Sequence, residues 1–279
     1  IEKNVLPESL QVLYLNSEYN QRIGYDVLPK TLKKLYLGPS FNQLLDPGVL
    51  PESLEQLFIG KEYNQPFIPD VLPKSLKRLV FDGELYGFDD YYYIPRYTDM
   101  QYNLGVKFNQ PFEPGVLPDS ITDLILPETY NHPINKNVLP KSLKNLSLGS
   151  KFNQPLEPGV FPDTFTELIL PETYNHPINK NVLPKSLKHL IINEEFNQPL
   201  EPGVFPDTLQ VLEIGSDFNQ PLKPGVLPES LKYLKLGHSF NQPLKPGVLP
   251  KSLKNLKLGS SFNQPLKPGV LPQSLVKLE

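Results

Sequence analysis

Apolar residues recur along this chain with a period of 22 residues. An apolar residue followed by proline marks each copy, and the thirteen anchor prolines are 22 residues apart except for one interval of 23. The anchors are Pro7, Pro29, Pro51, Pro73, Pro95, Pro118, Pro140, Pro162, Pro184, Pro206, Pro228, Pro250 and Pro272. Twelve copies also carry valine two residues before the anchor and leucine six residues after it. A fixed period of this length predicts stacked copies that share one core, because a single copy cannot bury its own apolar face.

Each copy predicts one short strand and an irregular return. The segment Leu231-x-x-Leu234-x-Leu236 alternates from its second leucine onward, which is the period of a strand with one buried face. Glycine often follows, and we expect it to end the strand and permit a turn. The remaining Pro-Leu-x-Pro-Gly-Val-Leu-Pro favours extended, non-helical backbone. The predicted fold is a right-handed repeat solenoid with one long parallel sheet, forming a single domain of about thirteen repeats over residues 1–279.

Composition excludes several classes of protein. The chain has 33 prolines, no cysteine and no tryptophan, so a helical bundle, a disulfide framework and a thiolate or cysteine-zinc site are ruled out. With 39% hydrophobic and 20% charged residues it is too apolar for a disordered tail. No apolar run is long enough for a membrane helix, and the first residues do not resemble a signal peptide. The start at Ile1, without methionine, suggests a fragment or a processed product.

Two tetrapeptides recur in register with the anchors. Phe-Asn-Gln-Pro occurs at Phe152 to Pro155, Phe196 to Pro199, Phe218 to Pro221, Phe240 to Pro243 and Phe262 to Pro265, and Tyr-Asn-His-Pro at Tyr130 to Pro133 and Tyr174 to Pro177. With the leucine pattern and period, these residues resemble the FNIP repeat, a relative of the leucine-rich repeat found mainly in amoebal and giant-virus proteins. The resemblance implies a leucine-rich-repeat-like solenoid. In that family an F-box often precedes the repeats and ties them to ubiquitin ligases, but this sequence contains none.

One stretch departs from the pattern. The irregular repeat at about 82–107 lacks the tetrapeptide and is rich in tyrosine and acidic residues. It is either a decayed coil whose tyrosines replace core residues, or a projecting acidic-aromatic contact loop. Tyrosine suits both, being apolar with one polar tip. Within it, Tyr91, Tyr92 and Tyr93 are candidate partner-binding residues.

Polar columns are interpreted as structural. We expect the asparagine of each tetrapeptide to bond the backbone of its own turn and of the next coil. The Ser/Thr column two residues after each anchor should serve a similar local purpose. His132 and His176 share one column two coils apart, roughly 10 Å, which is too far to share a metal. No catalytic triad, paired-carboxylate or phosphate-binding motif occurs, so we predict a non-enzymatic protein without cofactor or metal.

Variation between copies points to a binding face. The residue seven after each anchor should point outward from the sheet, where polar side chains are the rule. This column is instead apolar over much of its length and supplies the other candidate partner-binding residues: Tyr14, Tyr36, Phe58, Val80, Ile125, Ile169 and Ile191. Exposed apolar patches mark interaction sites. The alternative is that these side chains only support the sheet through cross-strand packing.

Charge is uneven along the chain. Residues 221–279 contain nine lysines and two acids, net +7, and since the whole chain is −3 the first 220 residues carry −10. This asymmetry suits an acidic partner, head-to-tail docking, or simply a solvated basic face. The overall negative charge argues against nucleic acid.

These patterns together predict a protein-interaction scaffold. The predicted binding surface is the outer face of the sheet, in the host cytoplasm or a virion, without membrane contact. The family resemblance adds the expectation that the chain is the substrate-recognition part of an F-box-type ubiquitin-ligase adaptor. The alternative is a structural protein that self-associates through the ends of the solenoid or coats a particle.

Overall fold

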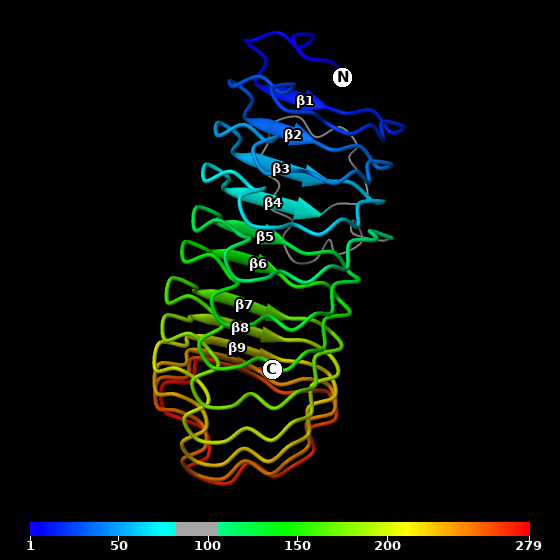
Figure 1. The fold of residues 1–279 in the computed structure, drawn as a ribbon. Coiled ribbons are helices and arrows are strands. Elements are labelled where there is room, and N and C mark those ends of the chain that lie inside the picture. The colour runs from blue at the N-terminus through cyan, green and yellow to red at the C-terminus, as the bar shows by residue number, and fades with distance from the viewer. Residues whose placement is uncertain (82–104) are drawn as a thin grey trace. The chain divides into compact units, whose positions relative to one another are not determined.

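The computed structural model describes residues 1–81 and 105–279, and this part of the chain contains strands and turns but no helix. Figure 1 shows short strands following one another in chain order. Their bounds are β1 Val12–Tyr14, β2 Lys34–Tyr36, β3 Gln56–Ile59, β4 Arg78–Phe81, β5 Asp123–Ile125, β6 Asn145–Ser147, β7 Glu167–Leu170, β8 His189–Ile192, β9 Val211–Ile214, β10 Tyr233–Lys235, β11 Asn255–Lys257 and β12 Lys277–Leu278. The predicted parallel-strand solenoid is confirmed.

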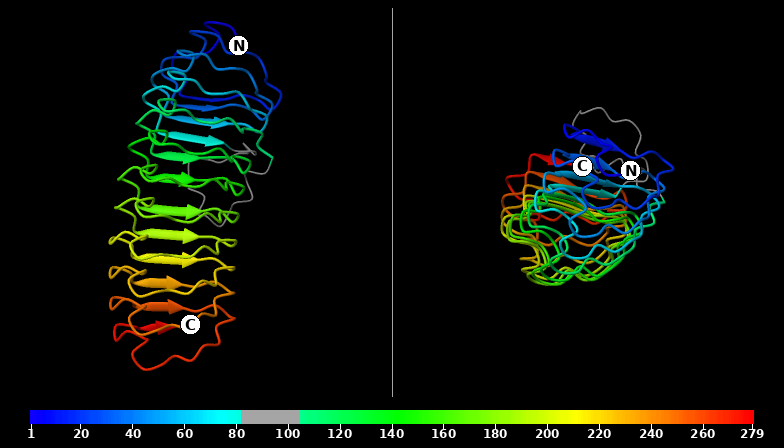
Figure 2. Two further views of the ribbon diagram at one scale, coloured as in Figure 1. Left: turned by 60° about the horizontal axis from the view of Figure 1, so that its bottom comes forward. Right: turned by 45° about the horizontal axis from the view of Figure 1, so that its top comes forward.

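The strands form two six-stranded parallel sheets, where the sequence predicted one long sheet. One sheet has the order β1 to β6 and the other β7 to β12. The chain likewise divides into two compact units, Ile1–His132 with Asn137–Gly149, and Pro133–Lys136 with Ser150–Glu279. Each unit is described by itself below. Within each one, consecutive strands are neighbours, as the left view of Figure 2 shows.

The first unit continues its stack directly from β4 to β5. Arg78 pairs with Asp123 and Leu79 with Leu124, so no other strand stands between these two. The backbone nitrogen of Asn109 likewise bonds Asn64 Oδ1 at 2.9 Å, across 45 residues of sequence. The described residues therefore hold twelve strands, compared with the expected thirteen or so. The choice between a decayed coil and a projecting loop concerns residues outside the described part.

Strand pairing follows the 22-residue register. Leu35 pairs with Leu57, and Leu234 with Leu256, each partner being the same residue of the next copy. The leucine six residues after the anchor is fully buried in the interior copies, as at Leu57 and Leu212. Phenylalanine rings of the tetrapeptide stack inside the coil, as Phe218 does on Phe240 with ring centroids 6.1 Å apart. Burial of the same side chain in successive interior coils stabilises the stack.

Two glycine columns are needed for different reasons. In the Pro-Gly turn the glycine has a positive φ, such as 85° at Gly115, and Asn137 takes its place one coil later with φ 64°. The glycine after the strand was expected to serve a turn by its flexibility, but Gly237 does not have a positive φ. A Cβ there would lie 1.9 Å from the carbonyl oxygen of Gly215. Close stacking of consecutive turns, rather than a special φ, therefore excludes a side chain at Gly237.

Candidate functional site

Three aromatic rings form a continuous stack on the outward face of the first sheet. Tyr14, Tyr36 and Phe58 occupy the same register position on β1, β2 and β3. Successive ring centroids are 4.1 Å apart, with interplanar angles of 12° and 6°. Tyr14 is 58% exposed, whereas its core neighbour Leu15 is buried. We call these three residues the aromatic stripe; they are the part of the predicted face that the structure brings together.

Arg78 lies at one end of the aromatic stripe. Its guanidinium carbon is 5.7 Å from the centroid of the Phe58 ring, within the range of a cation–π contact. Beyond it, Val80 is only 5% exposed, because this short side chain stands in register between Phe58 and Ile125. In this outward column of the first sheet, Tyr14 is therefore the exposed side chain, whereas Tyr36, Phe58 and Ile125 are half-buried.

The second sheet has a different outward face. Ile169 is 8% exposed and Ile191, its partner in register, is half-buried. The column then becomes charged, with Lys235 Nζ 2.8 Å from Glu213 Oε2 and Lys257 Nζ 3.1 Å from Glu279 Oε2. The Glu213 carboxylate raises the pKa of Lys235, chiefly through its hydrogen bond, and the lysines at positions 277 and 257 lower that of Glu279. The remaining candidates, at positions 91, 92 and 93, lie outside the described residues.

The asparagine column forms a ladder between coils, which confirms the expected bonds to the next coil. Asn219 Oδ1 accepts a hydrogen bond from the backbone nitrogen of Asn241 at 2.9 Å and from Gln242 Nε2 at 3.1 Å. The same pattern joins Asn20 to Asn42 in the first unit at 2.9 Å. One carbonyl oxygen thus satisfies two donors of the next coil, where an unpaired backbone N–H would be costly.

Both histidines of the tetrapeptide column take the place of glutamine in this ladder. His132 Nε2 lies 2.9 Å from the backbone oxygen of Asn109, and His176 Nε2 lies 3.0 Å from that of Asn153. A carbonyl oxygen can only accept, so this ring nitrogen donates in each case. The histidines therefore have a structural bonding role.

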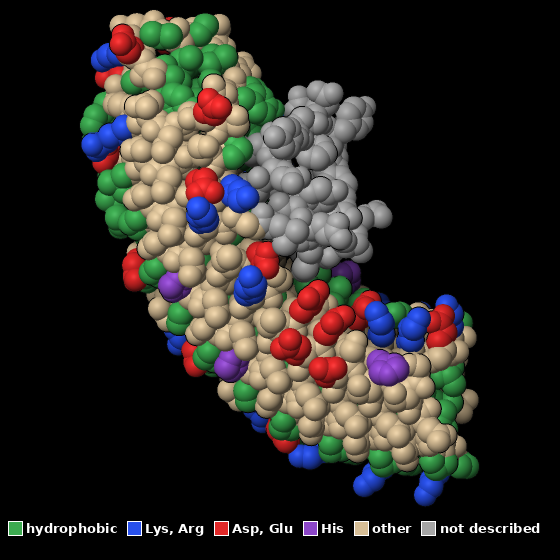
Figure 3. All heavy atoms as spheres, turned by 90° about the vertical axis from the view of Figure 1, so that its right-hand side faces the viewer, with side chains coloured by type: hydrophobic (Ala, Val, Ile, Leu, Met, Phe, Trp, Pro, Cys, Tyr) green, Lys and Arg blue, Asp and Glu red, His purple; other side chains and the backbone are tan. Residues whose placement is uncertain are grey.

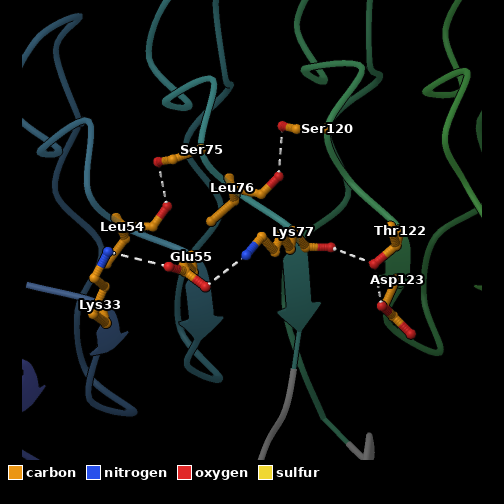
Figure 4. A network of polar contacts seen from close by, with 9 residues as sticks. All are labelled: Lys33, Leu54, Glu55, Ser75, Leu76, Lys77, Ser120, Thr122 and Asp123. Atoms are coloured by element: carbon orange, nitrogen blue, oxygen red, sulfur yellow. Dashed lines mark hydrogen bonds and ion pairs between the residues drawn. The ribbon is translucent and has the colours of Figure 1, made fainter.

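The Ser/Thr column also bonds between coils, and the expected local role was wrong. Figure 4 shows Ser75 Oγ donating to the carbonyl oxygen of Leu54 at 2.6 Å and Ser120 Oγ to that of Leu76 at 2.7 Å. Each hydroxyl reaches the preceding coil rather than its own turn, because stacking places that carbonyl closer. Sequence alone gives the column but not the direction of its bonds.

Ion pairs run beside this column on the first sheet. Glu55 bonds Lys33 Nζ at 3.1 Å and Lys77 Nζ at 2.8 Å, as Figure 4 shows. The hydrogen bonds from Lys77 and Lys33 lower the pKa of the Glu55 carboxyl. These side chains are partly exposed, so the pairs contribute at most about 1 kcal/mol each.

A group of acidic turns in the second unit was missed from the sequence. Glu172, Glu194, Glu195 and Asp217 follow β7, β8 and β9. The turns stack through backbone bonds from Glu195 nitrogen to Glu172 oxygen at 3.0 Å and from Asp217 nitrogen to Glu194 oxygen at 2.9 Å. Figure 3 shows several acidic side chains close together on one face. The group is apparent only once consecutive turns are stacked. Residues 1–81 and 105–279 contain no set of side chains that could hold a metal ion.

The geometry defines a parallel-strand solenoid of the leucine-rich-repeat type. A model of the FNIP repeat matches residues 1–40, 41–84, 103–129, 130–173, 174–217, 218–260 and 240–279. The chain therefore belongs to the FNIP-repeat family.

One similar solved structure shows the same architecture. CroV588, described as a novel circular leucine-rich-repeat protein and coming from a giant virus, is 34% identical with a TM-score of 0.68. The alignment covers 100% of this chain and 47% of that one, so this chain spans about half the length of that protein. A leucine-rich-repeat protein from Bacteroides ovatus is 12% identical, with 96% and 82% of the two chains covered and a TM-score of 0.25.

No curated protein matches the chain. Over the residues that the structure describes, no helix has the length and apolar character needed to cross a bilayer.

Proposed function

We propose that this chain is a non-enzymatic scaffold that binds a protein partner through the outward face of its sheet, with the aromatic stripe as the anchor. The repeat scaffold is of a type consistent with protein–protein interaction. The observation that carries the proposal is the stack of Tyr14, Tyr36 and Phe58, with one tyrosine more than half exposed on a face where polar residues are expected. Large rigid aromatic side chains dominate binding energy at protein interfaces.

Cross-strand stabilisation alone accounts for only part of this arrangement. Stacked aromatic pairs contribute about 0.5–1.5 kcal/mol beyond burial, so the stack supports the sheet. Yet the corresponding positions on β10 and β11 hold Lys235 and Lys257, and those strands pair in the same register without aromatic rings. Strands of this repeat therefore pair in this register without aromatic rings at the outward position, which leaves partner contact as the better explanation of the exposed tyrosine on the first sheet.

The test compares two variants that each carry three substitutions to serine. One replaces Tyr14, Tyr36 and Phe58 with serine. The other replaces Gln56 and Asn145, which lie on the same sheet outside the aromatic stripe, and Lys144, which directly precedes β6, with serine. We expect the first variant to lose capture of proteins from host-cell lysate by about tenfold or more and the second to capture like the unaltered chain. Equal capture by both, with unchanged circular dichroism, would contradict the proposal.

The family resemblance also supports a finer proposal, that the scaffold reads substrates for an F-box-type ubiquitin ligase. It predicts that ligase subunits are recovered with the full natural chain. Recovery of partners without any ligase subunit would count against it, and would leave the scaffold proposal standing.

Self-association through the ends of the solenoid is the second candidate. The similar solved structure is described as circular, which is a precedent for closing such a solenoid on itself. Light scattering over a hundredfold concentration range is the measurement: growth in mass supports end-to-end association, and a constant monomer mass argues against it.

A further inference from the structure

A shallow hollow crosses the ends of four neighbouring strands in the second unit. Its volume is about 480 Å³, and residues of β8 to β11 and their following turns line it. Two rows of side chains border it. The strand row is Ile191, Glu213, Lys235 and Lys257, and the turn row is Glu194, Ser216, His238 and Ser260.

The space between the two rows follows from the glycines in the turns. Gly215, Gly237 and Gly259 also line the hollow and carry no side chain to fill it. Their turns stack closely, since a Cβ at Gly259 would lie 1.8 Å from the carbonyl oxygen of Gly237. Four strands spaced roughly 4.8 Å apart span about 14 Å, which is the length of about four residues of extended chain.

Lysines concentrate at the β10–β11 end. We call Lys232, Lys235, Lys254 and Lys257 the lysine patch. Lys235 and Lys257 are partners in register on adjacent strands, and their side chains are 42% and 48% exposed. Lys232 and Lys254 lie three residues earlier in the same two coils and are exposed, but only Lys235 and Lys257 line the hollow itself.

Two carboxylates face the lysine patch, one on β9 and one directly after β12. Lys235 bonds Glu213 on β9, and Lys257 bonds Glu279, which follows β12. An ammonium has three donors, so one ion pair leaves donors for a further anion. Four lysines against two carboxylates leave a positive surface here, consistent with the net +7 of residues 221–279.

The other end of the hollow is not basic. Ile191 and Glu194 line it at β8, and no lysine or arginine borders it there. A nucleic-acid strand carries a phosphate on every residue and would meet Glu194 and Glu213 along this path. A peptide can place its acidic residues at one end and apolar residues at the other, so a peptide is the better match.

We propose that this hollow binds an extended peptide segment of a partner protein, with acidic residues on the lysine patch and an apolar residue against Ile191. This site is separate from the aromatic stripe, which belongs to the other sheet. The lysines that make the C-terminal part of the chain net positive then form part of a local binding surface. Extended peptide segments are recognised by side-chain pockets along a groove.

Fluorescence anisotropy with a labelled hexapeptide tests this proposal. The probe carries three glutamates followed by Gly-Leu-Leu, and the full chain is titrated at low and at physiological salt. We expect Lys235→Ala/Lys257→Ala to weaken binding about fivefold to tenfold. The control Lys245→Ala/Lys267→Ala removes the same charge from exposed lysines of the return segments and should change binding less than about twofold.

Each other outcome overturns the proposal. Equal weakening by both double variants would mean general charge attraction. No binding at low salt would mean that the hollow is not a site. Stronger binding of an oligouridine of equal charge, in competition with the peptide, would assign the surface to nucleic acid. Replacing the aromatic stripe with serine should leave peptide affinity unchanged, so failure of this site and failure of the scaffold proposal are distinguishable.

Discussion

At the scale of single residues, Tyr63 carries a polar group that the core does not use. Its side chain is fully buried between Phe41 and Phe108, and its hydroxyl has no hydrogen-bond partner in the described structure. Burial raises the pKa of this phenol, as expected for a group out of contact with water. A buried hydroxyl without a partner costs about 1–3 kcal/mol.

Removing that hydroxyl should therefore stabilise the fold. We expect Tyr63→Phe to raise the free energy of unfolding by about 1 kcal/mol, measured by urea denaturation. Phe41→Tyr, which adds a hydroxyl in the preceding coil, is the reverse control and should destabilise. A destabilised Tyr63→Phe would show that the hydroxyl has a partner, such as a buried water.

The two glycine columns give a second prediction at this scale. Gly115 has a φ of 85° and open space around its Cβ position, so alanine there should cost about 1–2 kcal/mol through backbone strain alone. Gly115→Asn should cost less, because Asn137 already adopts this conformation in the next coil. Gly237→Ala and Gly237→Asn should both be more destabilising than Gly115→Ala, because the neighbouring backbone blocks any Cβ. Thermal unfolding of the four variants provides the test, and a larger loss for Gly115→Asn than for Gly115→Ala would contradict it.

Single positions also show which side-chain properties the sequence could not predict. The outward column could be read from its spacing, and Tyr14 is exposed as expected, but Val80 in the same column is buried. Exposure of one side chain depends on the size of its neighbours on adjacent coils, and the pattern of one coil does not contain that information. The direction of the Ser75 hydrogen bond was missed for the same reason.

At the scale of the structural element, the asparagine ladder holds consecutive return segments together. Asn219 Oδ1 accepts two hydrogen bonds from the next coil, each worth about 1 kcal/mol. Asn219→Leu removes the acceptor and leaves a backbone N–H unpaired, so we expect a loss of about 2 kcal/mol in the free energy of unfolding. Asn219→Asp keeps the acceptor and should lose less at pH 7. Equal losses in chemical denaturation would show that the ladder depends on the amide nitrogen instead.

Strands were the best-predicted elements because their signal is local and repeated. Leu234 and Leu236 fix which face is buried, and the period fixes their partners in the next coil. In the sequence, the lysine patch could be recognised only as an excess of positive charge. Its ion pair with Glu213 and the hollow beside it arise from the stacking of consecutive coils. Repetition therefore specifies the scaffold more fully than it specifies any binding site on it.

At the scale of the whole molecule, the sequence predicts one solenoid domain, while the strands fall into two sheets of six. The anchors continue without interruption through Pro140, Pro162 and Pro184, which is the pattern of one nearest-neighbour stack. In such a stack, weakening one coil lowers the stability of the others through their shared interfaces. We therefore keep the single-domain prediction and expect the two units to unfold together.

Hydrogen exchange with mass spectrometry can measure this coupling directly. Leu57→Ala in the first unit and Leu212→Ala in the second each remove a fully buried side chain, which costs about 2–5 kcal/mol. If the chain is one cooperative domain, each substitution should speed exchange in peptides from both units under conditions where global unfolding dominates exchange. An exposed substitution, Lys245→Ala, should leave exchange unchanged in both. Faster exchange confined to the substituted unit would show that the two sheets are separate folding units, because only independent domains open without affecting each other.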